Sequence, residues 1–117
     1  MNVDTTRIAD MFLSECHERE IGLWAIIWEV RFETNDGTYP KVELDKSEPK
    51  AVRRATMEVV SKLLTGGIVV AVFEEDGSGL SRWKGSVRSS YDHIVEFWDT
   101  LGREPEMTDN LFFISDV

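Results

Sequence analysis

Residues 47–83, SEPKAVRRATMEVVSKLLTGGIVVAVFEEDGSGLSRW, decide the fold of this 117-residue chain. The first half of the stretch has apolar or small side chains at spacings of three and four, the pattern of a helix with one buried face. Ser47 is its expected N-cap, and Pro49 falls in the first turn, where a missing N–H costs nothing. Gly66 and Gly67 supply the left-handed position that ends a helix. The face consists of Val52, Thr56, Val59, Val60, Leu63 and Leu64.

The second half of the stretch predicts a strand and a hairpin. Residues 68–73, IVVAVF, are mostly β-branched or aromatic and too few for another helix, so we expect a buried strand. Asp76-Gly77 and Ser78-Gly79 then turn the chain back toward residues 80–83. A helix followed by such a hairpin is typical of the second half of a winged helix.

Amphipathic helices are predicted on both sides of this stretch. The first has Thr5 or Thr6 as its N-cap and ends near Cys16, and the second begins at Ser86 or Ser89. The glycine at position 102 ends the second helix. Their apolar faces are Ile8, Met11, Phe12 and Cys16 in the first, and Val87, Tyr91, Ile94, Val95, Trp98 and Leu101 in the second.

Residues 22–33 allow two interpretations. In a strand, alternate residues from Ile26 to Phe32 would share one face, and residues 35–37 would form a hairpin turn into residues 38–44. Leu23 and Ile27 break this alternation but complete an apolar helical face. We therefore predict a helix.

The remaining segments complete a single domain, residues 1–117. The loop 34–46 is expected to contain one short extended segment around Val42. Residues 111–114, LFFI, are expected to form a terminal strand that pairs with the strand at 68–73. The prediction is an α+β, winged-helix-like fold of about four helices with a small antiparallel sheet, made of the ribbon 68–83 and a C-terminal strand.

Composition indicates how the chain is stabilised and in which cellular compartment we expect it. Hydrophobic residues make up 42% of it, enough for a core that needs neither metal nor disulfide. The single cysteine, Cys16, rules out an intrachain disulfide and fits a reducing compartment. No secretion signal and no apolar run long enough for a bilayer are visible. We expect a cytoplasmic protein without a membrane partner.

Charge is the most informative bulk property. The chain has 22 Asp and Glu against 13 Lys and Arg, a net charge of −9 at pH 7. Residues 92–117 hold seven carboxylates against Arg103 alone, a net charge of −6. Such a field repels phosphate backbones and favours encounter with a basic protein. Two basic patches stand against this trend, Lys50, Arg53 and Arg54 in one and Arg82, Lys84 and Arg88 in the other.

No residue pattern predicts catalysis, a metal or a cofactor. Cys16-His17 lacks the second ligand pair of a structural zinc site. Asp92 cannot orient His93, because adjacent helical residues point about 100° apart, and no nucleophile elbow is present. The glycines match no phosphate-binding loop. We therefore expect a protein that is not an enzyme and takes no cofactor.

Four tryptophans are large anchors for so small a chain. Trp24 and Trp98 lie at helical spacing with other apolar residues and are expected in the core. Trp83 lies between Arg82 and Lys84, where its indole either seals the core or joins a binding surface.

Several segments together resemble a pattern found in small bacterial proteins. They are Leu63-Leu64-Thr65-Gly66-Gly67-Ile68-Val69, Gly79 through Trp83, Trp98-Asp99-Thr100-Leu101-Gly102-Arg103-Glu104-Pro105, and Asp109 before Phe112-Phe113. Those proteins resemble winged helices in element order. Some are similar in size and acidity to the immunity proteins of contact-dependent inhibition and related toxin systems. The resemblance covers roughly residues 47–114 and implies an immunity role.

Two functions follow as hypotheses. The first is an immunity protein that binds a cognate basic toxin domain, expected to be a nuclease, and blocks it by protein–protein contact. The alternative is a winged-helix nucleic-acid-binding or regulatory module that uses the two basic patches. The net charge disfavours the alternative, because an anionic surface weakens phosphate binding. The expected toxin contacts are Glu74, Glu75, Asp76, Asp92, Glu96, Asp99, Glu104 and Glu106.

Overall fold

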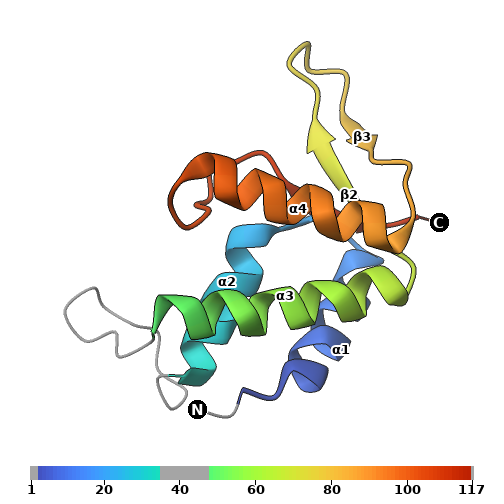
Figure 1. The fold of residues 1–117 in the computed structure, drawn as a ribbon. Coiled ribbons are helices and arrows are strands. Elements are labelled where there is room, and N and C mark those ends of the chain that lie inside the picture. The colour runs from blue at the N-terminus through green and yellow to red at the C-terminus, as the bar shows by residue number, and fades with distance from the viewer. Residues whose placement is uncertain (1–2, 35–47, 117) are drawn as a thin grey trace.

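The computed structural model describes residues 3–34 and 48–116, which form an α+β fold (Figure 1). This part of the chain contains four helices and one four-stranded antiparallel sheet with the strand order β1-β4-β2-β3. In chain order the elements are α1 (Thr5–Cys16), β1 (Ile21–Gly22), α2 (Leu23–Thr34), α3 (Pro49–Thr65), β2 (Ile68–Phe73), β3 (Leu80–Arg82), α4 (Val87–Leu101) and β4 (Phe112–Ser115).

The central helix α3 follows the predicted pattern, and every residue of its predicted face is buried. Pro49 lies in the first turn as expected. The N-cap position belongs to Glu48, whose side chain makes no capping hydrogen bond, so the prediction of Ser47 is wrong. Gly67 has the left-handed φ of +94° that follows the helix end.

The ends of α1 and α4 show which capping predictions hold. Asp4 is the N-cap of α1, because its carboxylate accepts a hydrogen bond from the Arg7 N–H at 3.0 Å. The prediction of Thr5 or Thr6 is therefore wrong by one or two residues. Ser86 caps α4 as predicted, and Gly102 ends it with a φ of +66°.

Residues 23–34 are helical, which confirms the helical interpretation of this segment. The strand that had been weighed against it is excluded for these residues. The extended segment expected around Val42 lies outside the described residues.

The sheet confirms one predicted pairing and adds a strand. β4 lies antiparallel to β2, with Val70 opposite Phe113, as expected for the terminal strand. β1 was not predicted, and it pairs with the other edge of β4 through Ile21 opposite Phe113. Two residues are too few to show an alternating pattern, so this strand had no visible signal in the sequence.

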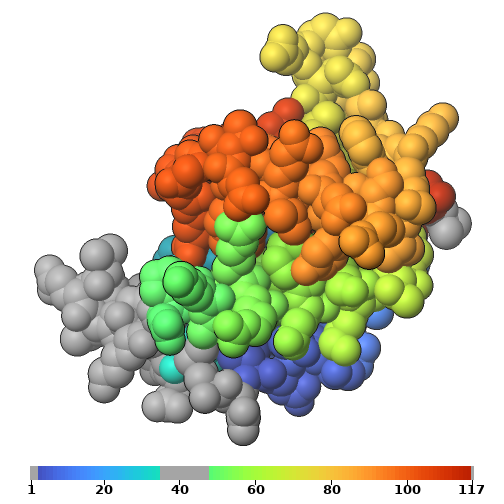
Figure 2. All heavy atoms as spheres, in the orientation of Figure 1, coloured from blue at the N-terminus to red at the C-terminus, as the bar shows by residue number. Residues whose placement is uncertain are grey.

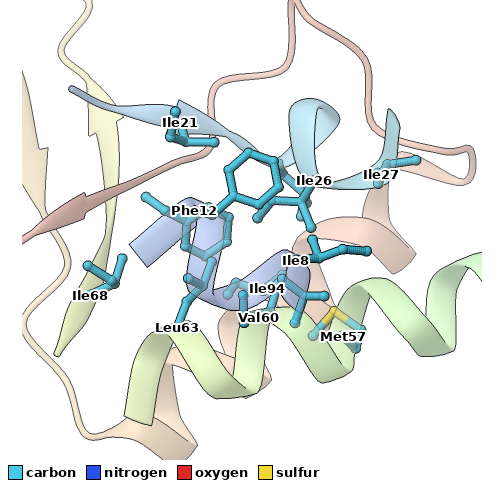
Figure 3. Close-up of a cluster of buried hydrophobic side chains, with 14 of the residues drawn as sticks. Ile8, Phe12, Ile21, Ile26, Ile27, Met57, Val60, Leu63, Ile68 and Ile94 are labelled. Carbon is cyan, nitrogen blue, oxygen red and sulfur yellow. The ribbon is translucent and has the colours of Figure 1, made fainter. Parts of the chain in front are cut away.

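The core lies between the helices and one face of the sheet. Side chains from α1, α2, α3 and α4 meet those of the sheet in one buried cluster, which includes Ile8, Ile26, Val60, Ile68 and Ile94 (Figure 3). Trp98 belongs to this cluster with 6% of its surface exposed, as predicted. Trp24 does not belong to it, and its prediction as a core residue is wrong.

Candidate protein-binding surface

The β2–β3 hairpin projects away from the helical body (Figures 1 and 2). Glu74, Glu75 and Asp76 lie at its tip, and all three side chains are exposed. Among the described residues, no cation forms an ion pair with any of them. The tip therefore presents three carboxylates to solvent on the most protruding part of the described chain.

Hydrogen bonds fix the conformation of this tip. The Glu74 N–H donates to the Gly79 carbonyl at 2.9 Å, and the Ser78 N–H donates to the Asp76 carboxylate at 2.9 Å. Hydrogen bonding from Ser78 lowers the pKa of Asp76. The carboxylate of Asp76 is thus held in place by the Ser78 N–H, in a turn whose shape is set before any partner arrives.

Asn110 holds the base of the hairpin. Its side-chain amide accepts a hydrogen bond from the Phe73 N–H and donates one to the Phe73 carbonyl, each at 2.8 Å. The Phe73 ring also packs edge-on against Phe112, with 5.0 Å between ring centroids. These contacts tie the last residue of β2 to the segment that leads into β4.

The acidic candidates on α4 are partly neutralised by arginines. Asp92 is 3.3 Å from Arg88 of the same helix, and Asp99 is 2.7 Å from Arg53 of α3. Glu96 is exposed and forms no ion pair within the described chain. The three acids line a shallow hollow together with Val95 and Thr100.

The last two candidates, beyond α4, are also paired. Glu104 receives two hydrogen bonds from Arg31 of α2, at 2.6 and 3.2 Å. Glu106 is 3.8 Å from Arg103, but that guanidinium is bound more closely by Asp109, at 2.7 and 2.9 Å. The Arg31–Glu104 pair joins segments that are separate in the chain, whereas the contacts of Arg103 are local to the loop after α4. The paired carboxylates are less available to a partner.

The eight predicted contacts therefore fall into two groups. Four of them are ion-paired with arginines, and the structure does not gather all eight on one surface. The carboxylates without an ion pair in the described chain are Glu74, Glu75, Asp76 and Glu96.

The basic patches are divided in the same way. Arg53 is bound to Asp99 and lies over the Trp98 ring, 5.1 Å from its centroid. Lys50 and Arg54 are exposed and line a groove between α3 and α4, beside Tyr91. The arginine that stacks on Trp98 thus fastens α4 to α3.

Trp83 stacks flat on His93 of α4, with 4.2 Å between ring centroids and 6° between ring planes. The indole is 40% exposed, so it covers the side of α4 and also contributes to the surface. Gly85 allows this position, because a Cβ there would lie 2.5 Å from the indole nitrogen. Trp83 fastens the end of β3 to α4.

Residues 3–34 and 48–116 contain neither a cluster of metal ligands, nor a membrane-spanning helix, nor a reactive thiol. No three side chains of His, Cys, Asp or Glu come together there in a way that suits a metal ion. No helix in those ranges has the length and apolar character needed to cross a membrane. Burial, with a smaller contribution from the charge of Glu15, raises the pKa of the Cys16 thiol to about 12. This thiol is therefore not a nucleophile at neutral pH.

One surface was missed in the sequence. The residues of β2 and β4 that point away from the core are also apolar, where the solvent side of an antiparallel sheet is usually polar. The signal was present in IVVAVF and LFFI, which lack alternating polar residues. We predicted a buried strand at 68–73 and a terminal strand at 111–114, with no exposed apolar face on either.

Comparisons with protein-family models, with curated proteins and with solved structures found no match for this chain.

Proposed function

We propose that this chain is an immunity protein that binds and neutralises a cognate toxin domain, a basic nuclease, by protein–protein contact. The observation that carries the proposal is the projecting hairpin, whose tip holds three exposed carboxylates that no cation of the described chain neutralises. The protein needs no reaction of its own for this role. It occupies the toxin's basic surface and excludes the substrate.

Electrostatics supports such a role at two distances. At long range, the net charge of −9 attracts a basic partner and speeds encounter. At short range, carboxylates at the hairpin tip can take the places that substrate phosphates occupy in a nuclease cleft. The fixed turn lowers the ordering cost of binding, because its conformation does not have to be selected from many.

The ion-paired carboxylates contribute less to this proposal than those at the tip. Asp99 and Glu104 would have to leave Arg53 and Arg31 before they could bind a cation of the partner. Exchange of one arginine for another brings little net free energy at a partly exposed site. We therefore assign the main electrostatic contacts to Glu74, Glu75 and Asp76.

Co-expression with the protein encoded by the neighbouring gene tests this function. We expect a stable complex and rescue of growth by the wild-type chain. A triple variant, Glu74→Gln, Glu75→Gln and Asp76→Asn, should bind the toxin domain more slowly and more weakly than wild type, because it removes three charged contacts at the hairpin tip.

The control removes the same charges elsewhere. Asp10→Asn, Glu18→Gln and Glu20→Gln neutralise one aspartate and two glutamates that are also exposed. This variant should slow association slightly and leave the complex stable. Absence of both a complex and growth rescue with the wild-type chain would refute the proposed function.

A second candidate, a winged-helix nucleic-acid-binding module, draws on the exposed Lys50 and Arg54 of α3 and on Arg82 beside the hairpin. A recognition helix must be free to enter the major groove. Here α4 packs along α3, and the Arg53–Asp99 pair and the buried Trp98 hold the two helices together. These contacts and the negative net charge make this the weaker candidate.

A fluorescence titration with double-stranded DNA at low salt separates the two candidates. The immunity role predicts no binding at micromolar protein. Binding at that concentration with a steep dependence on salt would favour the nucleic-acid module.

A further inference from the structure

The two faces of the sheet differ in what covers them. On the inner face, Ile68, Val70 and Phe113 are 0–2% exposed and belong to the core. On the other face, Val69, Phe112 and Ile114 are only partly buried, and 41% of the Phe73 surface is exposed. We call this second surface the outer face. Its apolar residues are Trp24, Val69, Ala71, Phe73, Leu80, Phe112 and Ile114, of which Ala71 itself is 0% exposed.

Strand register places these side chains next to one another. Residues directly opposite in an antiparallel pair point to the same side of the sheet. Val69 is opposite Ile114, Ala71 is opposite Phe112, and Phe73 is opposite Leu80. Ala71 is also opposite Arg82, so this arginine lies on the same side of the sheet, at its β3 edge. The outer face is therefore a continuous apolar surface across β4 and β2 that reaches Leu80 on β3 and is bordered there by Arg82.

An aromatic row extends this surface to β1. Gly22 is opposite Phe112, and a Cβ on Gly22 would lie 2.5 Å from the Trp24 indole and 3.5 Å from the Phe112 ring. The indole thus lies on the bare backbone of the strand, beside Phe112, which in turn packs against Phe73. A glycine in a strand commonly marks such a close approach. Trp24, predicted as a core residue, is in fact part of the outer face.

The outer face has the composition of an interaction site. Antiparallel sheets that face water usually present polar side chains there, and a contiguous apolar patch on a small protein commonly marks a binding surface. Aromatic residues at the centre of such a patch are the residue types that contribute most to protein interfaces. Three of the seven residues of the outer face are aromatic.

Charges around the outer face indicate which charges a complementary partner would carry. Phe73 is followed at once by the carboxylates of Glu74, Glu75 and Asp76, and at the opposite end of the sheet Ser115 is followed by Asp116. Arg82 lies on β3, at the sheet edge, where a cation discourages pairing with a further strand. An apolar centre with an anionic rim at both ends is complementary to an apolar ridge flanked by lysine or arginine.

A second copy of the chain fits these charges poorly. Each copy carries a net charge of −9, and two outer faces in contact would bring like-charged rims together. A basic protein meets no such repulsion.

We propose that the outer face is the surface on which the basic toxin domain docks, with its apolar residues on the aromatic row and its cations at the hairpin tip. The inference rests on the proposed immunity function and deepens it, because it assigns the contact to the sheet and away from α4. Most of the binding free energy then comes from the apolar contacts of Trp24, Phe73 and Phe112. The hairpin carboxylates orient the partner and raise the rate of association.

Calorimetric titration against the domain encoded by the neighbouring gene tests the assignment. Val69→Thr with Ile114→Thr makes one cross-strand pair of the outer face polar and retains β-branched residues at both positions. Phe73→Ser removes the most exposed side chain among the apolar residues of the outer face. We expect each variant to bind at least 10-fold more weakly than wild type, with thermal melts confirming that both are folded.

The matched control is Val87→Thr, the same polar change at a 47% exposed residue of α4. It should bind within 2-fold of wild type, and so should Glu96→Gln. If wild type binds but the outer-face variants keep its affinity, the docking assignment is wrong and the proposed function stands. If wild type does not bind the domain at all, the proposed function fails and the assignment fails with it. A dimeric mass in light scattering that the outer-face variants convert to a monomeric mass would also overturn the assignment.

Discussion

A single hydroxyl in the core is the clearest feature at the scale of residues. Thr56 lies on the buried face of α3 with none of its surface exposed, and its Oγ1 has no hydrogen-bond partner among the described residues. A buried hydroxyl without a partner destabilises a fold by about 1–3 kcal/mol. The sequence predicts the position of Thr56 on this face but cannot show that the hydroxyl is unpartnered.

Thr56→Val should therefore stabilise the protein by about 1–2 kcal/mol, because valine has the same shape and lacks the hydroxyl. Urea denaturation measures the change in the free energy of unfolding. Thr56→Ser is the control, because it keeps the hydroxyl, removes a methyl group and should destabilise. A Thr56→Val variant less stable than wild type would show that the hydroxyl has a partner.

Asp109 gives a prediction about pH. The guanidinium of Arg103 donates to both of its carboxylate oxygens, and the Glu106 N–H donates to Oδ2 at 2.6 Å. The hydrogen bonds from Arg103 are the main cause that lowers the pKa of Asp109 below its usual 3.8. A lowered carboxyl pKa contributes stability that is complete above the unfolded pKa and is lost as pH falls through the folded pKa.

Asp109→Asn should therefore lower the urea midpoint clearly at pH 7 and less at pH 3, because the contribution of the charged interaction declines once the pH falls below the unfolded pKa. The Asn side chain keeps an acceptor for the Glu106 N–H, so the difference isolates the charged interaction with Arg103. Equal destabilisation at both pH values would contradict this account.

Ion pairs are also the residue-scale feature that sequence patterns could not supply. Arg53–Asp99 and Arg31–Glu104 join residues that are far apart in the chain, and no local spacing indicates which arginine meets which carboxylate. The predicted acidic surface treated residues 92–106 as unpaired for that reason. The sequence predicted the hairpin tip more accurately than the acidic surface of residues 92–106. The turn at the tip is made by local residues with glycines at the required positions.

At the scale of elements, local periodicity predicted the helices and the hairpin well. The face of α3, the Ser86 cap and the helical choice for residues 23–34 all come from patterns within one turn or two. Capping residues were misplaced where several candidates follow one another, as at Asp4 and Thr5. The position of Trp24 depends on the bare backbone of Gly22 in a strand too short to recognise, so it was not predictable.

The hydrogen bonds of the Asn110 side chain at the base of the β2–β3 hairpin can be tested directly. Asn110 lies two residues before β4, and its side chain bonds both backbone groups of Phe73, so it extends the contact between β2 and this segment beyond the β2–β4 ladder. Asn110→Ala should cost about 1–2 kcal/mol, the net value of two such hydrogen bonds. Amide hydrogen exchange at Phe73 and Glu74 should accelerate, while exchange in α3 changes only with global stability.

Thr108→Ala changes an exposed residue of the same loop and serves as the control for this prediction. If Asn110→Ala left exchange at Phe73 unchanged, the amide would not be what holds the base of the hairpin.

At the scale of the whole molecule, charge and shape divide the protein into two parts. In the helical body, arginines pair with four of the carboxylates of residues 92–106 and neutralise much of their negative charge. The sheet and its hairpin carry an apolar outer face and carboxylates without ion pairs in the described chain. The bulk charge of −9 favours a basic partner but says nothing of where it would bind. The structure places the apolar outer face and the three hairpin carboxylates together on the sheet, which is the basis of the proposed docking surface.

The indole signals of the four tryptophans provide the most direct test of this account. In a proton–nitrogen NMR spectrum each indole reports on a different place: Trp24 on the outer face, Trp83 over His93, Trp98 in the core and Trp28 on the exposed side of α2. Titration with the domain encoded by the neighbouring gene should shift the Trp24 indole and the hairpin amides, and leave Trp98 and Trp28 in place. Shifts of the Trp98 indole signal and of the α4 amide signals, with the Trp24 indole signal unchanged, would contradict the assignment of the docking surface to the sheet.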